Sequence, residues 1–189
     1  MRTLGPGDAL VIVDVQNDFC PGGALAVPHG EEVIPVLNHW IEKAERAGIP
    51  IFASRDWHPP GHISFKERGG PWPIHCVQES QGAEFHRDLK LPKLAHIVSK
   101  ATIPDVESYS GFAGTGLAET LRRMGVRRLW VGGLALDYCV KETVVDGLRE
   151  GFEVHVIHEA TRPVNVSSDD GEEALRTMGE AGAIIEEVA

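Results

Sequence analysis

Hydrophobic positions along the chain follow two alternating patterns. Short apolar runs such as "ALVIVDV" at residues 9–15 are typical of strands buried on both faces. Between such runs, apolar residues recur every three or four positions, as they do in "VIPVLNHWIEKAERAG", which is typical of an amphipathic helix. These patterns predict strands at residues 9–15, 49–56, 95–101, 127–133, 152–160 and 183–188. They predict helices at residues 30–48, 114–125, 137–151 and 169–182.

The alternation of strands and helices predicts an α/β fold. Strand–helix–strand units make parallel strands and place helices on both faces of a sheet. We therefore expect one domain over residues 1–189, a three-layer α/β/α structure with a mostly parallel central sheet of about six strands. Residues 56–94 have no regular period. A loop of this length inside a compact domain usually has a function.

Charge and cysteine usage narrow the classes of function. The 189 residues carry a formal net charge of −10, which argues against a nucleic-acid partner. No run of about 18 apolar residues is present, so we expect no membrane partner. The three cysteines, Cys20, Cys76 and Cys139, have unrelated spacings. They form no disulfide framework and predict a reducing, cytoplasmic setting.

Four chemically capable residues lie where predicted strands end: Asp14, Asp56, Lys100 and Cys139. Ligands of parallel sheets bind beyond the carboxyl ends of the strands, so these residues are expected to meet. At the start of a helix the free N–H groups ease the ionisation of a thiol such as Cys139. Asp14 can accept its proton, and Lys100 can hold the developing charge. The alternative is that each is structural, with Cys139 as a core residue.

A second group lies in the loop sequence "RDWHPPGHISFKERGGPWPIHCV". Asp56, His58 and His75 offer one carboxylate and two imidazoles, a set that suits zinc, iron or manganese and leaves coordination positions open. His62 is a possible fourth ligand. The alternative is that each of these histidines is solvated or forms hydrogen bonds without binding a metal. The sequence therefore predicts one divalent transition metal, with zinc placed first.

Three motifs together resemble a known family: "DVQNDF" at residues 14–19, "DWHP" at residues 56–59, and "GLALDYCV" at residues 133–140. They resemble the nicotinamidase branch of the isochorismatase-like cysteine hydrolases over nearly the whole chain. By this resemblance the catalytic triad is Asp14, Lys100 and Cys139, and the metal ligands are Asp56, His58 and His75.

The resemblance implies further features of the site. It implies a cis peptide between Leu134 and Ala135, which would turn the Ala135 N–H toward that of Cys139 to form an oxyanion hole. Phe19 and Trp72 match positions where the family sandwiches a pyridine ring, and core packing is the alternative role of both rings. Some family members have a fourth protein ligand six residues after the first histidine, where this chain has Ser64.

The activity implied by the resemblance is hydrolysis of nicotinamide, a small-molecule amide, to nicotinic acid and ammonia through a cysteine thioester, as part of NAD salvage. The resemblance also implies a homodimer or larger homo-oligomer. One alternative is a sister cysteine amidohydrolase acting on a carbamoyl or ureido substrate. Isochorismatase proper is a weaker one, because it has no need of the thiol. A non-catalytic metal-binding protein would give no reason for Asp14, Lys100 and Cys139 to occur together.

Overall fold

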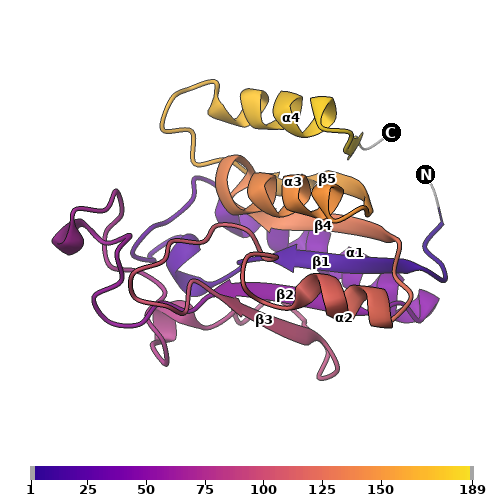
Figure 1. Ribbon diagram of the computed structural model, residues 1–189, viewed down its shortest axis with the longest axis horizontal. Helices are drawn as coiled ribbons and strands as arrows, with labels where there is room; N and C mark the ends of the chain where they lie inside the picture. Colours follow the sequence, from indigo (N-terminus) through magenta and orange to yellow (C-terminus); the bar gives the residue numbers. More distant parts are fainter. Residues whose placement is uncertain (1–2, 188–189) are drawn as a thin grey trace.

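The computed structural model describes residues 3–187, and its centre is one sheet of six strands (Figure 1). All neighbouring strands are parallel, and their order across the sheet is β3-β2-β1-β4-β5-β6. The strands are β1 (Asp8–Val13), β2 (Ile51–Asp56), β3 (His96–Lys100), β4 (Arg128–Leu134), β5 (Glu153–Arg162) and β6 (Ile184–Glu186). Each predicted strand is present, although Val188, the last residue predicted for β6, lies outside the described residues.

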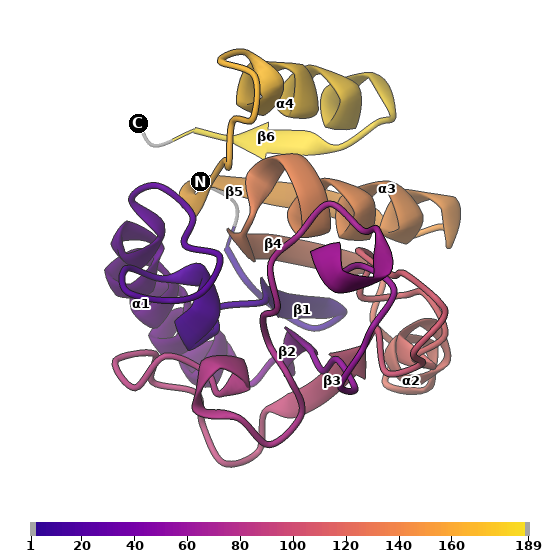
Figure 2. The ribbon, with the colours of Figure 1, turned by 90° about the vertical axis from the view of Figure 1, so that its left-hand side faces the viewer.

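Helices cover both faces of the sheet, which confirms the three-layer α/β/α prediction (Figure 2). The helices are α1 (Val33–Ala47), α2 (Leu117–Arg123), α3 (Lys141–Arg149) and α4 (Asp170–Glu180). Alternate side chains of β1 point to opposite faces. Leu10 and Ile12 pack in the core beneath α1, whereas Ala9 and Val11 pack in the core beneath α2, α3 and α4. This two-sided burial explains why β1 reads as a continuous apolar run.

One helix begins later than its sequence pattern predicts. The predicted helix at residues 137–151 is a π-helical turn, Leu136–Val140, followed by α3 from Lys141. The spacing of apolar residues in this segment does not reveal the π turn. The extra residue of one such turn shifts the repeat of apolar positions only locally. Cys139 therefore lies in the π turn.

Successive strands are added on one side of β1 up to β3 and on its other side from β4 onward. This change of direction between β1 and β4 predicts where the site lies. In parallel α/β sheets such a reversal opens a crevice beyond the carboxyl ends of the two central strands. The long loops gather beyond the arrowheads at this same edge (Figure 1). Close packing of β4 on β1 needs Gly133, because a Cβ there would lie 2.1 Å from the Val13 carbonyl oxygen.

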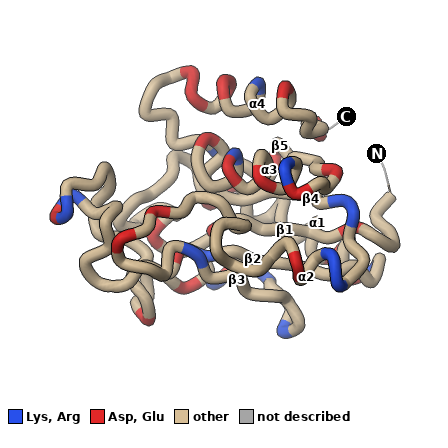
Figure 3. The backbone as a smooth tube through the Cα atoms, viewed as in Figure 1, with Lys and Arg blue, Asp and Glu red and all other residues tan. Residues whose placement is uncertain are grey.

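Charged residues are dispersed over the described part of the chain. Lys and Arg occur on several elements and are interspersed with Asp and Glu (Figure 3). No helix between residues 3 and 187 is both long enough and apolar enough to cross a bilayer.

Candidate active site

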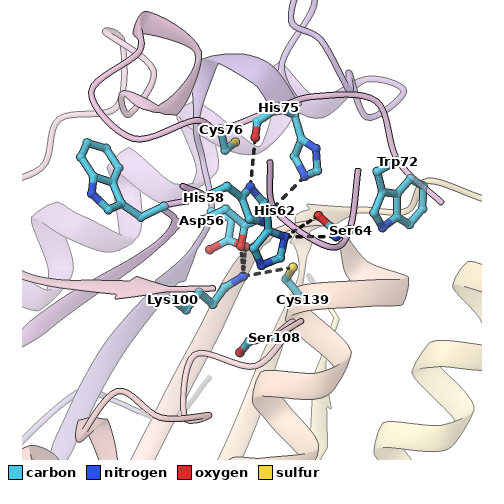
Figure 4. Close-up of polar contacts among 12 residues, drawn as sticks. Asp56, His58, His62, Ser64, Trp72, His75, Cys76, Lys100, Ser108 and Cys139 are labelled. Atoms are coloured by element: carbon cyan, nitrogen blue, oxygen red, sulfur yellow. Dashed lines mark hydrogen bonds and ion pairs between the residues drawn. The ribbon is translucent and has the colours of Figure 1, made fainter. Parts of the chain in front are cut away.

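The four residues selected at strand ends meet at the carboxyl edge of the sheet. Asp14 follows β1, Asp56 ends β2, Lys100 ends β3, and Cys139 lies in the turn after β4. Figure 4 shows Lys100 directed at Asp56 and Cys139, with the loop histidines above them. All four are buried, and the Lys100 side chain is 0% exposed. The structure thus brings together residues that are up to 125 positions apart, from 14 to 139.

Lys100 is at the centre of this group. Its Nζ lies 2.8 Å from Asp14 Oδ2 and donates to Cys139 Sγ at 3.4 Å and to Asp56 Oδ1. Asp14 Oδ1 accepts a hydrogen bond from the Ser54 hydroxyl at 2.7 Å. Asp14 Oδ2 pairs with the ammonium by charge but accepts no directed hydrogen bond from a described residue. A buried carboxylate oxygen in this state has a lone pair available for another proton.

Burial and charge act in opposite directions on this group. Burial by itself would lower the pKa of Lys100, but Asp14 and Asp56 outweigh it and raise that pKa well above its usual range. Burial raises the pKa of Asp14, although Lys100 opposes the rise. Burial would also raise the pKa of Asp56, but Lys100 and His58 outweigh it and lower that pKa. Lys100 is therefore a permanent ammonium between two carboxylates.

The pKa of the Cys139 thiol differs from the sequence-based prediction. Burial raises its pKa well above the usual value of a thiol, Lys100 opposes that rise, and the Asp14 and Asp56 charges add to it. The prediction of an easily ionised thiol is wrong for the free protein, because Cys139 is buried and shares its surroundings with two carboxylates. A carboxylate oxygen of Asp14 and the Sγ lie within 4.8 Å of each other. The resting protein thus holds a thiol beside a potential proton acceptor.

Asp56, His58 and His75 converge on one point. The His58 Nε2 and His75 Nε2 atoms lie 4.0 and 3.9 Å from Asp56 Oδ2. Two atoms bound to one ion at about 2.1 Å can be at most about 4.2 Å apart, so these separations fit a shared transition metal. All three side chains are buried, and all three candidate ligand atoms lie within 4.8 Å of one another.

The protonation of both histidines suits metal binding. His58 Nδ1–H donates to the His75 carbonyl at 3.0 Å, and His75 Nδ1–H donates to the Pro73 carbonyl at 2.7 Å. A carbonyl oxygen can only accept, so each Nδ1 carries a proton, and in the neutral ring the lone pair is on Nε2, the atom that faces Asp56. Burial lowers the pKa of His58 to about 4, which keeps its ring neutral. The donor set therefore fits a divalent cation.

His62 is occupied by other partners. Its Nε2–H donates to the Val106 carbonyl at 3.0 Å, and its Nδ1 accepts from the Ser64 N–H and lies 2.8 Å from the Ser64 hydroxyl. A ring nitrogen that carries a proton cannot bind a metal. This pattern removes His62 from the candidate metal ligands and gives it a structural role.

A pocket that opens to solvent lies above these groups. Its walls include both predicted ring-binding residues, Phe19 and Trp72, together with Cys139 and the candidate metal ligands. The sequence did not single out Tyr109 and Tyr138, which complete the aromatic wall. Tyr109 lies outside the quoted motifs, and Tyr138 lies within "GLALDYCV", where the motif assigns it no role. Only the folded chain shows that both rings reach the pocket.

The Leu134–Ala135 peptide is cis, as the resemblance implies. Ala135 and Cys139 both line the pocket. Their use as an oxyanion hole stays a prediction.

Gln16 fixes the position of Asp56, a role that the sequence did not reveal. Its Oε1 accepts the Asp56 N–H at 2.8 Å, and its Nε2 donates to the carbonyls of Asp56 and Ala83 at 2.8 and 2.9 Å. The partners are 40 and 67 residues away in sequence. Gln16 is fully buried, so no water can replace these bonds.

We expect Gln16→Ala to lower the free energy of unfolding by roughly 2–4 kcal/mol, because it leaves three buried backbone groups without partners. Urea unfolding measures this loss. Asn17→Ala is the matched control, since it removes a bond to the Gln81 carbonyl at an exposed position and should cost less than about 1 kcal/mol. Equal losses in the two variants would show that Gln16 does not fix Asp56.

Asp18 fixes the backbone next to His75 in a similar way. Its Oδ2 accepts the N–H of Cys76, the next residue, at 2.8 Å, and its Oδ1 accepts the Ala24 N–H at 3.1 Å. Gly82 packs so closely against this carboxylate that a Cβ there would lie 2.1 Å from Oδ2. The "DVQNDF" motif therefore supplies one acid beside the thiol and two residues that hold the candidate metal ligands.

The fold and the site define a hydrolytic enzyme built on a parallel α/β sheet. The isochorismatase domain matches residues 8–189. The chain is 41% identical over 201 residues to the nicotinamidase of Escherichia coli (strain K12), covering 95% of this chain and 94% of the relative. The chain belongs to the isochorismatase family, as its motifs predict.

Solved structures show the same relationship. The pyrazinamidase of Pyrococcus horikoshii, in complex with zinc, superposes with a TM-score of 0.93 at 50% identity, covering 97% of this chain and 100% of the relative. PnC1 from L. infantum, in complex with nicotinate, superposes with a TM-score of 0.89 at 33% identity, covering 99% and 96%.

Proposed function

We propose that this protein hydrolyses nicotinamide to nicotinate and ammonia. The observation that carries the proposal is that one aromatic pocket contains both the Cys139 thiol and the metal-binding donor set of Asp56, His58 and His75. The nicotinamidase relative and the relative that was solved with nicotinate support the same substrate. A flat heteroaromatic amide suits such a pocket, because its ring can pack between Phe19 and Trp72 while its amide reaches the thiol.

In the first half-reaction, Asp14 accepts the Cys139 proton as Sγ attacks the carboxamide carbon. A C–S bond forms and the carbonyl π electrons move to oxygen, which the backbone N–H groups of Ala135 and Cys139 stabilise. Asp14 then protonates the amide nitrogen, the C–N bond breaks and ammonia leaves. The first proton transfer, from the Cys139 thiol to Asp14, creates no new net charge in the buried group. It moves negative charge from Asp14 toward Sγ, and both groups lie beside the Lys100 ammonium.

In the second half-reaction, water replaces ammonia. Asp14 removes a proton from water as the water oxygen attacks the thioester carbon. The C–S bond then breaks, and Asp14 returns the proton to the Cys139 sulfur. Nicotinate leaves. Asp14 thus acts as base and then acid in each half-reaction, which suits a carboxyl group whose pKa is raised by burial.

Asp56, His58 and His75 would hold one divalent metal, for which we propose zinc first, because the Pyrococcus horikoshii relative was solved with zinc. Iron and manganese also suit this donor set. When bound, the metal supplies an open coordination position that a pyridine nitrogen can fill. Its role is to orient the ring, while this chain's own residues carry out the proton transfers.

The proposal extends to the metabolic role, the compartment and the oligomeric state of the protein. Nicotinate release is a step of NAD salvage, and three free cysteines suit a reducing cytoplasm. We propose a homodimer or larger assembly, which sedimentation in solution measures.

The function is tested by an ammonia-release assay over a panel of amides with the metal-loaded protein. The panel contains nicotinamide, pyrazinamide, benzamide, and one carbamoyl and one ureido compound. We expect nicotinamide to have the highest or an equal highest kcat/KM, with pyrazinamide near it. Preference for the carbamoyl or ureido compound would replace this proposal with a sister amidohydrolase, and no ammonia from any amide would contradict both.

We expect nicotinamide to be hydrolysed at least about a hundredfold faster than benzamide in kcat/KM, because a site built around one polar contact strongly rejects an isostere that lacks it. Removing the metal with a chelator, or the substitution His75→Ala, should remove this preference mainly by raising KM for nicotinamide. The measurement is kcat/KM for both amides on loaded, metal-free and variant protein.

The matched control for that comparison is His39→Ala, because His39 is an exposed histidine of α1. It should keep the preference for nicotinamide. Equal rates for the two amides on the loaded protein would show that the ring nitrogen is not recognised.

A further inference from the structure

The indole of Trp72 donates a hydrogen bond to a residue on a distant segment. Its Nε1–H donates to the Tyr109 hydroxyl at 3.0 Å, and the two residues are 37 positions apart in sequence. Both side chains are half-buried and both line the pocket. Burial raises the pKa of Tyr109, although the hydrogen bond from Trp72 opposes the rise, so the group remains a neutral phenol.

The backbone of Trp72 is fixed by other contacts. Its N–H donates to the Ser64 carbonyl at 3.1 Å, and its carbonyl accepts the Lys66 N–H at 2.7 Å. Rotation of the indole about its side-chain bonds is therefore the freedom that remains. The Tyr138 ring limits that rotation on one side, since the two ring centroids are 5.1 Å apart at an interplanar angle of 82°. The Tyr109 hydroxyl is the polar contact that selects one orientation.

Tyr109 is itself held in place from two directions. On one side, Val106 accepts a hydrogen bond from His62 at 3.0 Å. On the other side, the Gly111 N–H donates to the Thr143 hydroxyl of α3 at 3.0 Å. The segment that follows β3 therefore carries Tyr109 between the metal-binding loop and a helix of the main fold. A residue anchored in this way can orient Trp72 without depending on Trp72 for its own position.

We propose that Tyr109 is a positioning residue that orients the Trp72 indole as one wall of the ring-binding pocket. The inference rests on the proposed function, because it assigns Trp72 to the substrate ring. Tyr109 acts through Trp72 and takes no part in proton transfer. Loss of its hydroxyl should thus weaken substrate binding and leave the chemical step nearly unchanged.

A double-mutant cycle tests this coupling, with Tyr109→Phe and Trp72→Phe made singly and together. We expect Tyr109→Phe to raise KM for nicotinamide roughly threefold to tenfold, the effect of one lost hydrogen bond, with kcat within about twofold. In the Trp72→Phe background the same change should have almost no effect, since its partner is gone. Equal effects of Tyr109→Phe in the two backgrounds would overturn the inference.

Tyr138→Phe is the matched control. It removes a hydroxyl from the same wall, but no described residue hydrogen-bonds that hydroxyl. Its effect on KM should therefore be the same whether residue 72 is Trp or Phe. If Tyr138→Phe showed the coupling and Tyr109→Phe did not, the positioning role would belong to Tyr138.

A nitrogen–proton correlation spectrum gives a readout that does not depend on activity. The Trp72 indole resonance is assigned as the one lost in Trp72→Phe. Tyr109→Phe should shift it and speed its exchange with solvent, while Tyr138→Phe should leave its exchange rate unchanged. An unchanged resonance in Tyr109→Phe would overturn the inference even with the proposed function intact. Wild-type protein inactive on nicotinamide would instead refute the proposed function, and with it the role of Trp72.

Discussion

Replacing Cys139 with serine is expected to lower kcat for nicotinamide by at least about a thousandfold, because loss of a nucleophile removes the covalent route. The hydroxyl is far less acidic than the thiol, so Asp14 is too weak a base to activate it. The fold should survive. A serine hydroxyl can still accept from Lys100 and donate to Asp14, and we expect the free energy of unfolding to change by less than about 1 kcal/mol.

Steady-state ammonia release and urea unfolding measure both parts of this prediction. Cys20→Ser is the matched control, since Cys20 is also a buried thiol but does not line the pocket. At temperatures where this variant is folded, it should retain activity. A Cys139→Ser protein with kcat within about tenfold of the wild type would refute the assignment of the nucleophile.

Asp14→Asn is expected to lower kcat by about 10²–10⁴-fold, with the upper part of that range favoured because one carboxylate serves every proton transfer. The amide is nearly isosteric with the carboxylate but cannot accept the thiol proton and hold it as an acid. Substrate should still bind, because the aromatic wall and the metal-binding residues are unchanged. Calorimetric titration of the variant with nicotinamide separates binding from turnover.

Ser54→Ala is the companion variant. It removes the hydrogen bond to Asp14 Oδ1 but leaves the carboxylate in place, so we expect less than about a tenfold loss of kcat. If Asp14→Asn kept its kcat and only raised KM, Asp14 would be a binding residue and the proton-transfer scheme would be wrong.

The fold was predictable from the sequence because its signals are local. Apolar runs bounded by helical periods predict the six strands and four helices, and β1 is apolar enough to be recognised as a central strand. The order of the strands was not predictable. It depends on which strands pack together, as where Gly133 allows β4 to approach Val13.

The candidate site was partly predictable, because parallel strands end at the same edge of a sheet. This rule predicts that Asp14, Asp56, Lys100 and Cys139 meet, and the structure places them in contact. The residues that the sequence missed act through distant partners. Gln16 bonds Asp56, 40 positions away, and no local pattern marks such a contact.

Two details of the site depend on the folded environment. The raised pKa of Cys139 follows from burial and from the two carboxylates near Lys100, and helix position alone predicted the opposite direction. The structural role of His62 follows from the Val106 carbonyl, 44 positions away. Chemistry that depends on neighbours in space can be assigned only once those neighbours are known.

The central claim is that nicotinamide is hydrolysed through a thioester on Cys139, and trapping that intermediate tests it most directly. Metal-loaded protein is mixed with excess nicotinamide, quenched in acid within one turnover, digested and analysed by mass spectrometry. We expect a nicotinoyl group on the peptide that contains Cys139, and nicotinohydroxamate when hydroxylamine is present before the quench. Product formed within the same turnover, with no acylated peptide and no hydroxamate, would contradict the account.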